Sequence, residues 1–119
     1  MTHEQFVQNL VRRVAETFDE DERVAAELRA RLPEAVRIII GTLGPRRITL
    51  YGSLATGLFF ASRSDVDLAI EGLGYGPSDE LALALRQIFD RKVDLVDPAL
   101  VAPHIQRGIE QKGRVIYEP

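Results

Sequence analysis

The chain has 119 residues and a formal net charge of −3; 45% of its residues are hydrophobic and 28% are charged. This length allows one domain with a single hydrophobic core, and the composition is that of an ordinary globular protein rather than a disordered one. The acidic balance argues against direct binding to nucleic acid, because a surface that binds phosphates along a strand must be basic.

The absence of cysteine excludes disulfide bonds and thiolate metal ligands. The first 22 residues lack the uninterrupted apolar segment of a signal peptide, and no apolar run approaches the length needed to span a membrane. We therefore expect a cytoplasmic protein without a membrane anchor.

The first 45 residues are predicted to form three helical segments. Residues 3–18 carry apolar side chains at spacings of three and four residues, which is typical of an amphipathic helix. The acidic run at 19–22 predicts a turn and then the start of a second helix, which Pro33 ends or kinks. A third segment begins at Pro33 and stops at Gly44-Pro45.

From residue 46 the apolar period changes to two, which predicts strands. The expected order is a strand at 47–52, a strand at 65–70, a helix capped by Ser78, a strand at 92–96, a helical stretch from 97 to 112 and a last strand at 114–117. These two helical stretches are expected to bury Leu81, Leu85, Ile88 and Phe89, and Val101, Ile105 and Ile109. The predicted fold class is therefore α/β (α+β), a small mixed sheet of about four strands with flanking helices.

This order divides the chain into an N-terminal helical extension, residues 1–32, and a domain, residues 33–119. The extension either packs against the sheet or offers a docking surface to a second chain. The oligomeric state is left open between a monomer, a homo-oligomer and a hetero-oligomer.

Acidic residues on two of the predicted strands indicate a metal site. Asp65 and Asp67 occupy positions i and i+2, so their side chains point to one face, and Asp94 stands among apolar residues in the next strand. Carboxylate oxygens suit a hard cation such as Mg²⁺, which takes its other ligands from water and phosphates. The turn at Gly52-Ser53 would offer N–H groups to a phosphate. In the alternative interpretation, the acids are solvated or paired with Arg46, Arg47 or Arg63.

Two glycine-rich segments match other nucleotide-binding motifs only in part. The spacing Gly52 to Gly57 is that of a P-loop, but Leu-Phe follows where Lys-Ser/Thr is required, so we reject it. The run at 72–76 follows a strand like a dinucleotide fingerprint, but Pro77 replaces its third glycine. We expect this run to be a flexible connection near the active site. The adjacent Phe59 and Phe60 either shield a nucleotide or contact a partner.

The combined pattern resembles the signature of the DNA polymerase beta nucleotidyltransferase superfamily. An apolar residue, Gly and Ser are followed, after 11 residues, by Asp-apolar-Asp-apolar, and Asp94 is similar to the third carboxylate. The compact ending, a helix and then RVIYEP, is similar to the minimal nucleotidyltransferases, small prokaryotic members that are often encoded beside a HEPN-domain protein. The resemblance covers about residues 34–118. The matching segments read Tyr51-Gly52-Ser53 and Asp65-Val66-Asp67-Leu68.

The resemblance implies a nucleotidyltransferase fold and the magnesium-dependent transfer of AMP from ATP to a hydroxyl group on a partner protein. It assigns Gly52 and Ser53 to nucleotide binding. Asp65, Asp67 and Asp94 are assigned to catalysis and to the binding of two Mg²⁺ ions. It further implies that the partner is a HEPN-domain toxin and that this chain is its antitoxin.

The chain departs from the family pattern just after the first strand. Many minimal members read Gly-Ser-Arg-Ala-Arg-Gly there, whereas this chain has Leu54 and Thr56 in place of the arginines. The loss of two positive charges beside the triphosphate keeps a second hypothesis open, a non-catalytic binding module that neutralises its partner by occlusion. A third hypothesis is a transferase that acts on a small molecule.

Overall fold

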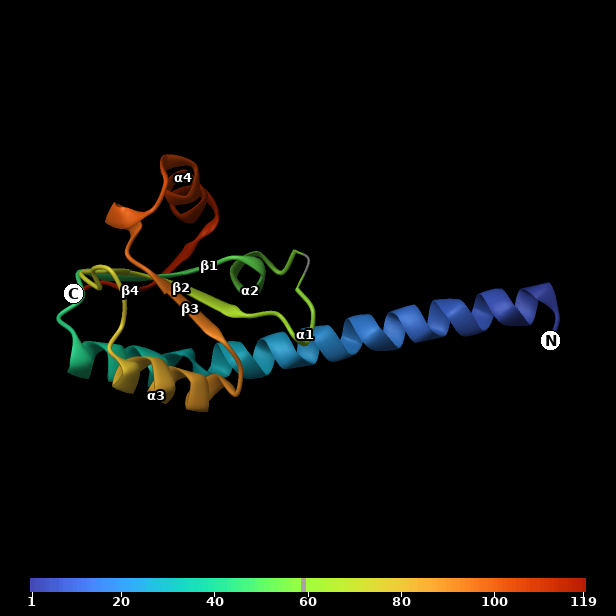
Figure 1. The fold of residues 1–119 in the computed structure, drawn as a ribbon. Helices are drawn as coiled ribbons and strands as arrows, with labels where there is room; N and C mark the ends of the chain where they lie inside the picture. The colour runs from blue at the N-terminus through green and yellow to red at the C-terminus, as the bar shows by residue number, and fades with distance from the viewer. Residues whose placement is uncertain (59) are drawn as a thin grey trace.

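The computed structural model describes residues 1–58 and 60–119 (Figure 1). Phe59, one of the two adjacent aromatic residues in the predicted loop, lies outside the described residues. The elements are α1 (His3–Thr42), β1 (Arg47–Tyr51), α2 (Ser53–Thr56), β2 (Val66–Glu71), α3 (Asp79–Phe89), β3 (Val93–Val96), the 3-10 turn η1 (Pro98–Leu100), α4 (Pro103–Lys112) and β4 (Arg114–Tyr117). Within the described ranges, none of these helices is both long enough and apolar enough to cross a membrane.

Four strands form one mixed sheet in the order β3-β2-β1-β4. β1 runs antiparallel to β2 and β4, and β2 runs parallel to β3. The C-terminal half of α1 and α3 cover one face of this sheet, and α4 lies over the other (Figure 1). The predicted fold class, a small mixed sheet of about four strands with flanking helices, is confirmed.

The alternation of side chains along the strands separates a core face from a polar face. Ile48 and Leu50 of β1 and Val66, Leu68 and Ile70 of β2 are fully or almost fully buried in the cluster that includes α1 and α3. The residues between them point to the opposite face, on which α4 lies. The sequence period of two therefore places Asp67 on the α4 side of the sheet.

The predicted breaks in the N-terminal helices are wrong, because α1 is one continuous helix of 40 residues. It begins with a capping box between Thr2 and Gln5 and contains Pro33 in its interior. Proline removes only one hydrogen bond of the ladder. Leu28, Leu32, Ala35 and Ile39, which flank the proline, are buried, and this packing holds the helix together. The division of the chain at residue 32 stays a prediction.

The helix α4 is less buried than its sequence predicts. Ile109 is its one buried residue, whereas Ile105 is exposed and Val101, before the helix, is half-buried. The helix contacts the sheet mainly through β1, and Ile109 is the apolar side chain that is buried there. The expectation that Ile105 is a core residue is therefore wrong; its side chain instead lines a groove on the polar face.

Asp97 fixes the glycine-rich connection that follows β2. Its carboxylate is only 9% exposed and accepts backbone hydrogen bonds from Gly72 (3.2 Å), Gly74 (3.0 Å) and Ala99 (3.0 Å). Burial acts to raise the pKa of Asp97, but these hydrogen bonds and Arg46 outweigh it, so the pKa lies below the ordinary value. The charged carboxylate thus ties the end of β2 to the end of β3.

Asp97→Asn is expected to lower the free energy of unfolding by about 2 kcal/mol at pH 7, because an amide replaces one acceptor oxygen with a donor that faces backbone N–H groups. Since the folded pKa is depressed, the contribution is present above the ordinary aspartate pKa and is lost as the pH falls through the lower folded value. Urea unfolding at pH 7 and pH 3 would check this. Asp79→Asn, at the exposed start of α3, is the control and should change little.

Candidate active site

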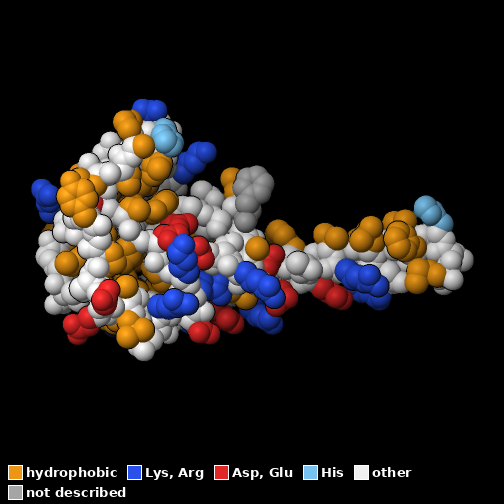
Figure 2. All heavy atoms as spheres, viewed as in Figure 1, with side chains coloured by type: hydrophobic (Ala, Val, Ile, Leu, Met, Phe, Trp, Pro, Cys, Tyr) orange, Lys and Arg blue, Asp and Glu red, His pale blue; other side chains and the backbone are white. Residues whose placement is uncertain are grey.

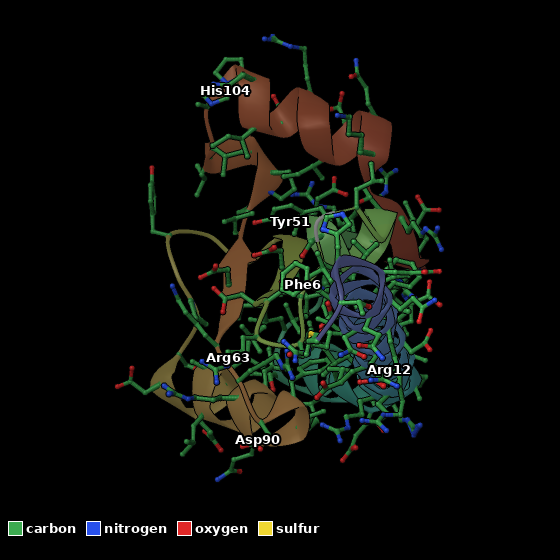
Figure 3. The ribbon with its side chains drawn as sticks, turned by 90° about the vertical axis from the view of Figure 1, so that its right-hand side faces the viewer. Phe6, Arg12, Tyr51, Arg63, Asp90 and His104 are labelled. Atoms are coloured by element: carbon green, nitrogen blue, oxygen red, sulfur yellow. The ribbon has the colours of Figure 1, made fainter. Side chains whose placement is uncertain are left out.

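One row of the sheet brings Tyr51, Asp67 and Asp94 together on the polar face. Tyr51 of β1 is paired with Asp67 of β2, and Asp67 is paired with Asp94 of β3. Residues that are directly paired across strands point to the same face, so the phenol and the two carboxylates are neighbours. Figure 3, which looks along α1, shows Tyr51 on the side of the sheet that faces α4.

Burial and the crowding of negative charge raise the pKa of Asp67 to about 6. Burial contributes most, followed by the charges of Asp94 and Asp65 and by a hydrogen bond to the Asp94 carboxyl; the nearby Lys92 acts in the opposite direction. Lys92 lies 3.4 Å from Asp94, but this lysine is well exposed, so it neutralises the pair only weakly. The carboxylate pair therefore keeps an excess of negative charge.

The same two carboxylates also affect the pKa of the Tyr51 hydroxyl. Burial, followed by the charges of Asp67 and Asp94, raises the pKa of its hydroxyl to about 12. The phenol therefore stays protonated at neutral pH, next to the two carboxylates. Sequence analysis used Tyr51 only as the apolar position before Gly-Ser. Its pairing with Asp67 could have been found by aligning the two antiparallel strands, but their register is not fixed by the sequence.

Gly52 gives the Asp67 carboxylate its space. Its backbone has φ +75° and ψ −160°, a conformation that is essentially restricted to glycine. A Cβ atom at this position would overlap the Asp67 carboxylate oxygen Oδ2 and would lie 3.2 Å from its Cγ. The glycine thus allows the turn after β1 to pass directly beside the carboxylate.

Asp65 lies one residue before β2 and is half-buried. It is close enough to raise the pKa of Asp67, but it does not close a compact group. Among residues 1–58 and 60–119, no three acidic or histidine side chains converge as a ready-made metal site. The structure therefore brings Asp67 and Asp94 together and leaves Asp65 beside them, and the three-carboxylate metal site stays a prediction.

The residues beside this row form an open groove of about 450 Å³. Its walls come from the end of β1, from α2 and from α4, and include Tyr51, Gly52, Ser53, Thr56, Ile105, Gly108 and Lys112. The first N–H groups of α2 have no partner within that helix. Lys112, which sequence analysis did not single out, is the one basic residue among the described groove residues. A nucleotide that binds here would meet the Gly-Ser turn and this lysine.

The two positions that depart from the family pattern have different environments. Leu54 is fully buried in the core, whereas Thr56 is half-buried and faces the groove. Arg29 of α1 donates hydrogen bonds to the Leu54 carbonyl from Nε (3.2 Å) and Nη2 (2.8 Å), and so holds the last turn of α2 from the opposite side. A basic side chain could be restored at Thr56, but not at Leu54, without opening the core.

Among the described residues, none of the predicted partners Arg46, Arg47 and Arg63 forms an ion pair with Asp65, Asp67 or Asp94. Arg47 pairs with Glu71 (3.4 Å) and Glu118 (2.8 Å), at the opposite end of β1 from the site.

The glycine-rich run at 72–76 follows the last residue of β2, whereas Asp67 lies near the first residue of this strand. The expectation that this run lies near the active site is therefore wrong. Phe60 is half-buried and packs partly against the core. The expectation that it shields a nucleotide or contacts a partner stays a prediction.

A mixed sheet with paired carboxylates beside a Gly-Ser turn defines the nucleotidyltransferase class of fold. The family model described as "Polymerase beta, Nucleotidyltransferase" matches residues 34–119. The chain belongs to this family. A comparison with curated proteins gave no match.

Solved structures support the same fold. A toxin–antitoxin structure with AMP-PNP has a TM-score of 0.60 at 22% identity and covers 71% of this chain and 70% of its own. The complex of tri-AMPylated Shewanella oneidensis HEPN toxin with MNT antitoxin has a TM-score of 0.59 at 18% identity, with coverages of 77% and 73%. A structure described as a minimal nucleotidyltransferase has a TM-score of 0.61 at 25% identity, with coverages of 75% and 92%.

Proposed function

We propose that this chain is a magnesium-dependent nucleotidyltransferase that transfers AMP from ATP to a hydroxyl group of a HEPN-domain protein and so acts as the antitoxin of a toxin–antitoxin pair. The observation that carries the proposal is the row of Asp67 and Asp94 beside the Gly52-Ser53 groove. The names of the similar structures, which mention AMP-PNP and an AMPylated HEPN toxin, support it.

The chemistry of the site fits magnesium. Burial and the charge of Asp94 on the adjacent strand raise the pKa of Asp67, so a divalent cation would stabilise the charged form of this carboxylate. Asp67 and Asp94, with Asp65 beside them, would hold the metal. When bound, Mg²⁺ supplies positive charge to the phosphates of the nucleotide.

In the proposed reaction, the acceptor hydroxyl oxygen forms a bond to the α-phosphorus of ATP, and the bond from this phosphorus to the oxygen that bridges to the β-phosphate breaks. Pyrophosphate leaves with that oxygen. Asp94, at the edge of the row, accepts the proton of the hydroxyl group. Gly52 and Ser53 hold the triphosphate through backbone N–H groups, and Lys112 adds positive charge.

A transfer assay tests this function directly. The full chain is incubated with its HEPN-domain partner, with Mg²⁺ and ATP labelled at the α-phosphate, and the partner is analysed by gel and by intact mass. Transfer of AMP that requires Mg²⁺ is expected. If a stable complex forms without transfer under any metal, the chain is instead a binding module, the alternative that the buried Leu54 favours.

Lys112→Met is expected to weaken the binding of magnesium-ATP by roughly five- to tenfold, because one charge-assisted contact to the triphosphate is lost at an exposed site. Isothermal titration calorimetry at two salt concentrations measures this, and the loss should shrink at higher salt. Arg107→Met, on the same helix but outside the groove lining, is the control. Equal effects of the two substitutions would contradict a specific role for Lys112.

A further inference from the structure

The N-terminal half of α1 projects beyond the sheet and carries an uncovered apolar surface (Figure 1). The overhang stripe consists of Phe6, Val7, Leu10, Val11, Val14 and Phe18. Within the described part of the chain, these six side chains are 42–62% exposed. Figure 2 shows hydrophobic side chains along one edge of the projecting helix and charged ones along the other, and Figure 3 shows Phe6 and Arg12 on different sides of it.

The overhang stripe continues the buried face of the same helix. The core residues Ala25, Leu28, Leu32, Ala35 and Ile39 follow Phe18 at helical spacing, so one apolar face runs along α1. The sheet and α3 cover only its second half. The first backbone contact from the domain reaches Asp21, whose carboxylate accepts a hydrogen bond from the Ser62 N–H at 2.8 Å. Residues 3–20 therefore form an overhang about 27 Å long at 1.5 Å per residue.

We propose that a second copy of this chain covers the overhang stripe, with the two α1 overhangs packed side by side and antiparallel. The spacing of the stripe supports this occupant, because the row Phe6, Leu10, Val14 and Phe18 is symmetric about residue 12, whereas Val7 and Val11 beside this row come opposite Thr17 and Arg13. Antiparallel pairing about that point places Phe6 opposite Phe18 of the second copy, and Leu10 opposite Val14. The symmetry is that of an isologous two-fold interface.

The length of the overhang fits the same arrangement. A helix lying on the stripe can extend only as far as residue 21 before it meets the domain, and the overhang of a second copy is of that length. If all six side chains were fully covered, two copies would bury roughly 1,000 Å² in total, which is the threshold for a specific interface and is below the standard size. A helix of this length is marginally stable alone in water, so pairing would also order it.

A pocket at the end of the overhang stripe is large enough to hold an aromatic ring. It has a volume of about 260 Å³ and is lined by the apolar Phe18, Ala25 and Phe60 and by the charged Asp21, Glu22 and Arg29. A cavity of about 150 Å³ already holds a benzene molecule. In the antiparallel pairing, Phe6 of the second copy comes to Phe18 and hence to this pocket.

Light scattering coupled to gel filtration tests the proposal on the full chain. The wild type is expected to be dimeric at micromolar concentrations, and Val14→Glu is expected to be monomeric with unchanged helical content of the domain. Gln8→Glu adds the same charge on the polar side of the overhang and should leave the dimer intact. A monomeric wild type, or a dimer that survives Val14→Glu, would overturn the proposal and leave the stripe to a different partner.

Disulfide trapping tests the antiparallel orientation, because the natural chain contains no cysteine. A mixture of Phe6→Cys and Phe18→Cys should form a mixed disulfide dimer under mild oxidation. Each variant alone should not crosslink, since identical positions lie about 18 Å apart along the paired helices. Efficient crosslinking of either variant with itself would instead show a parallel pair. These tests use no nucleotide and no HEPN protein, so their outcome is independent of the proposed AMP transfer.

Discussion

Asp67→Asn is expected to abolish AMP transfer, by at least a hundredfold in rate, and to make the metal-free protein more stable. The loss of activity follows because an amide cannot replace a carboxylate that is proposed to hold the metal and the phosphates. The gain in stability follows because the substitution removes a partly buried charge that faces Asp94 and Asp65. If Asp67 destabilises the metal-free protein, its role in the chain is functional rather than structural.

The raised pKa of Asp67 determines how the free energy of unfolding should change with pH. The folded pKa of Asp67, about 6, lies above the ordinary value of 3.8. Its contribution to stability is therefore fully present below about pH 4 and is lost as the pH rises through about 6. In EDTA, the free energy of unfolding of the wild type should fall over this range relative to Asp67→Asn. After allowance for solvent screening, the expected difference at pH 7 is roughly 1 kcal/mol.

With magnesium, the wild type should become more stable than Asp67→Asn, which is the reverse of the order expected in EDTA. An ion that binds only the folded state raises the melting temperature of the wild type, whereas Asp67→Asn should respond little. Asp90→Asn is the matched control, since Asp90 is exposed at the end of α3 with φ +52°, a conformation that asparagine tolerates. If Asp67→Asn destabilises the metal-free protein, or still transfers AMP at the wild-type rate, the role proposed for this carboxylate is wrong.

The sequence predicts the domain well where local signals and tertiary packing agree. The period of two over 47–52 and 65–70 places both central strands to within one residue at each end, and Ser78 caps α3 by accepting a hydrogen bond from the Leu81 N–H at 3.2 Å. It fails in α1, where the local signals at residues 19–22 and at Pro33 predict breaks. At Pro33, burial of the flanking Leu28, Leu32, Ala35 and Ile39 outweighs the cost of the proline.

In the candidate site, too, residues that belong to a local sequence motif could be predicted, whereas residues placed by tertiary structure could not. The motif locates Gly52, Asp67 and Asp94, because each belongs to a pattern of adjacent residues. The roles of Tyr51 and Lys112 depend on strand register and on where α4 crosses the sheet. Neither is encoded in a short segment, so neither could be read from spacing.

The conformation of Gly52 makes a second large effect predictable. Gly52→Ala is expected to lower the free energy of unfolding by about 3 kcal/mol or more, because alanine is strained at φ +75° and ψ −160° and its Cβ also collides with the Asp67 carboxylate. AMP transfer should fall with it, since the carboxylate must move away from the row it shares with Asp94.

Gly57 serves as a matched control that separates the backbone strain of Gly52→Ala from the overlap of its Cβ with the Asp67 carboxylate. Gly57 has φ +73° and ψ −6°, and among the described residues a Cβ there would meet only the Nη2 atom of Arg29, at 4.0 Å. Gly57→Ala should therefore cost about 1 kcal/mol, the ordinary penalty of a left-handed alanine. In urea unfolding, Asp67→Ala should relieve most of the additional cost of Gly52→Ala, which a double-mutant cycle measures. If the penalties at Gly52 and Gly57 are equal and do not couple to Asp67, close contact with the carboxylate is not what requires glycine at the end of β1.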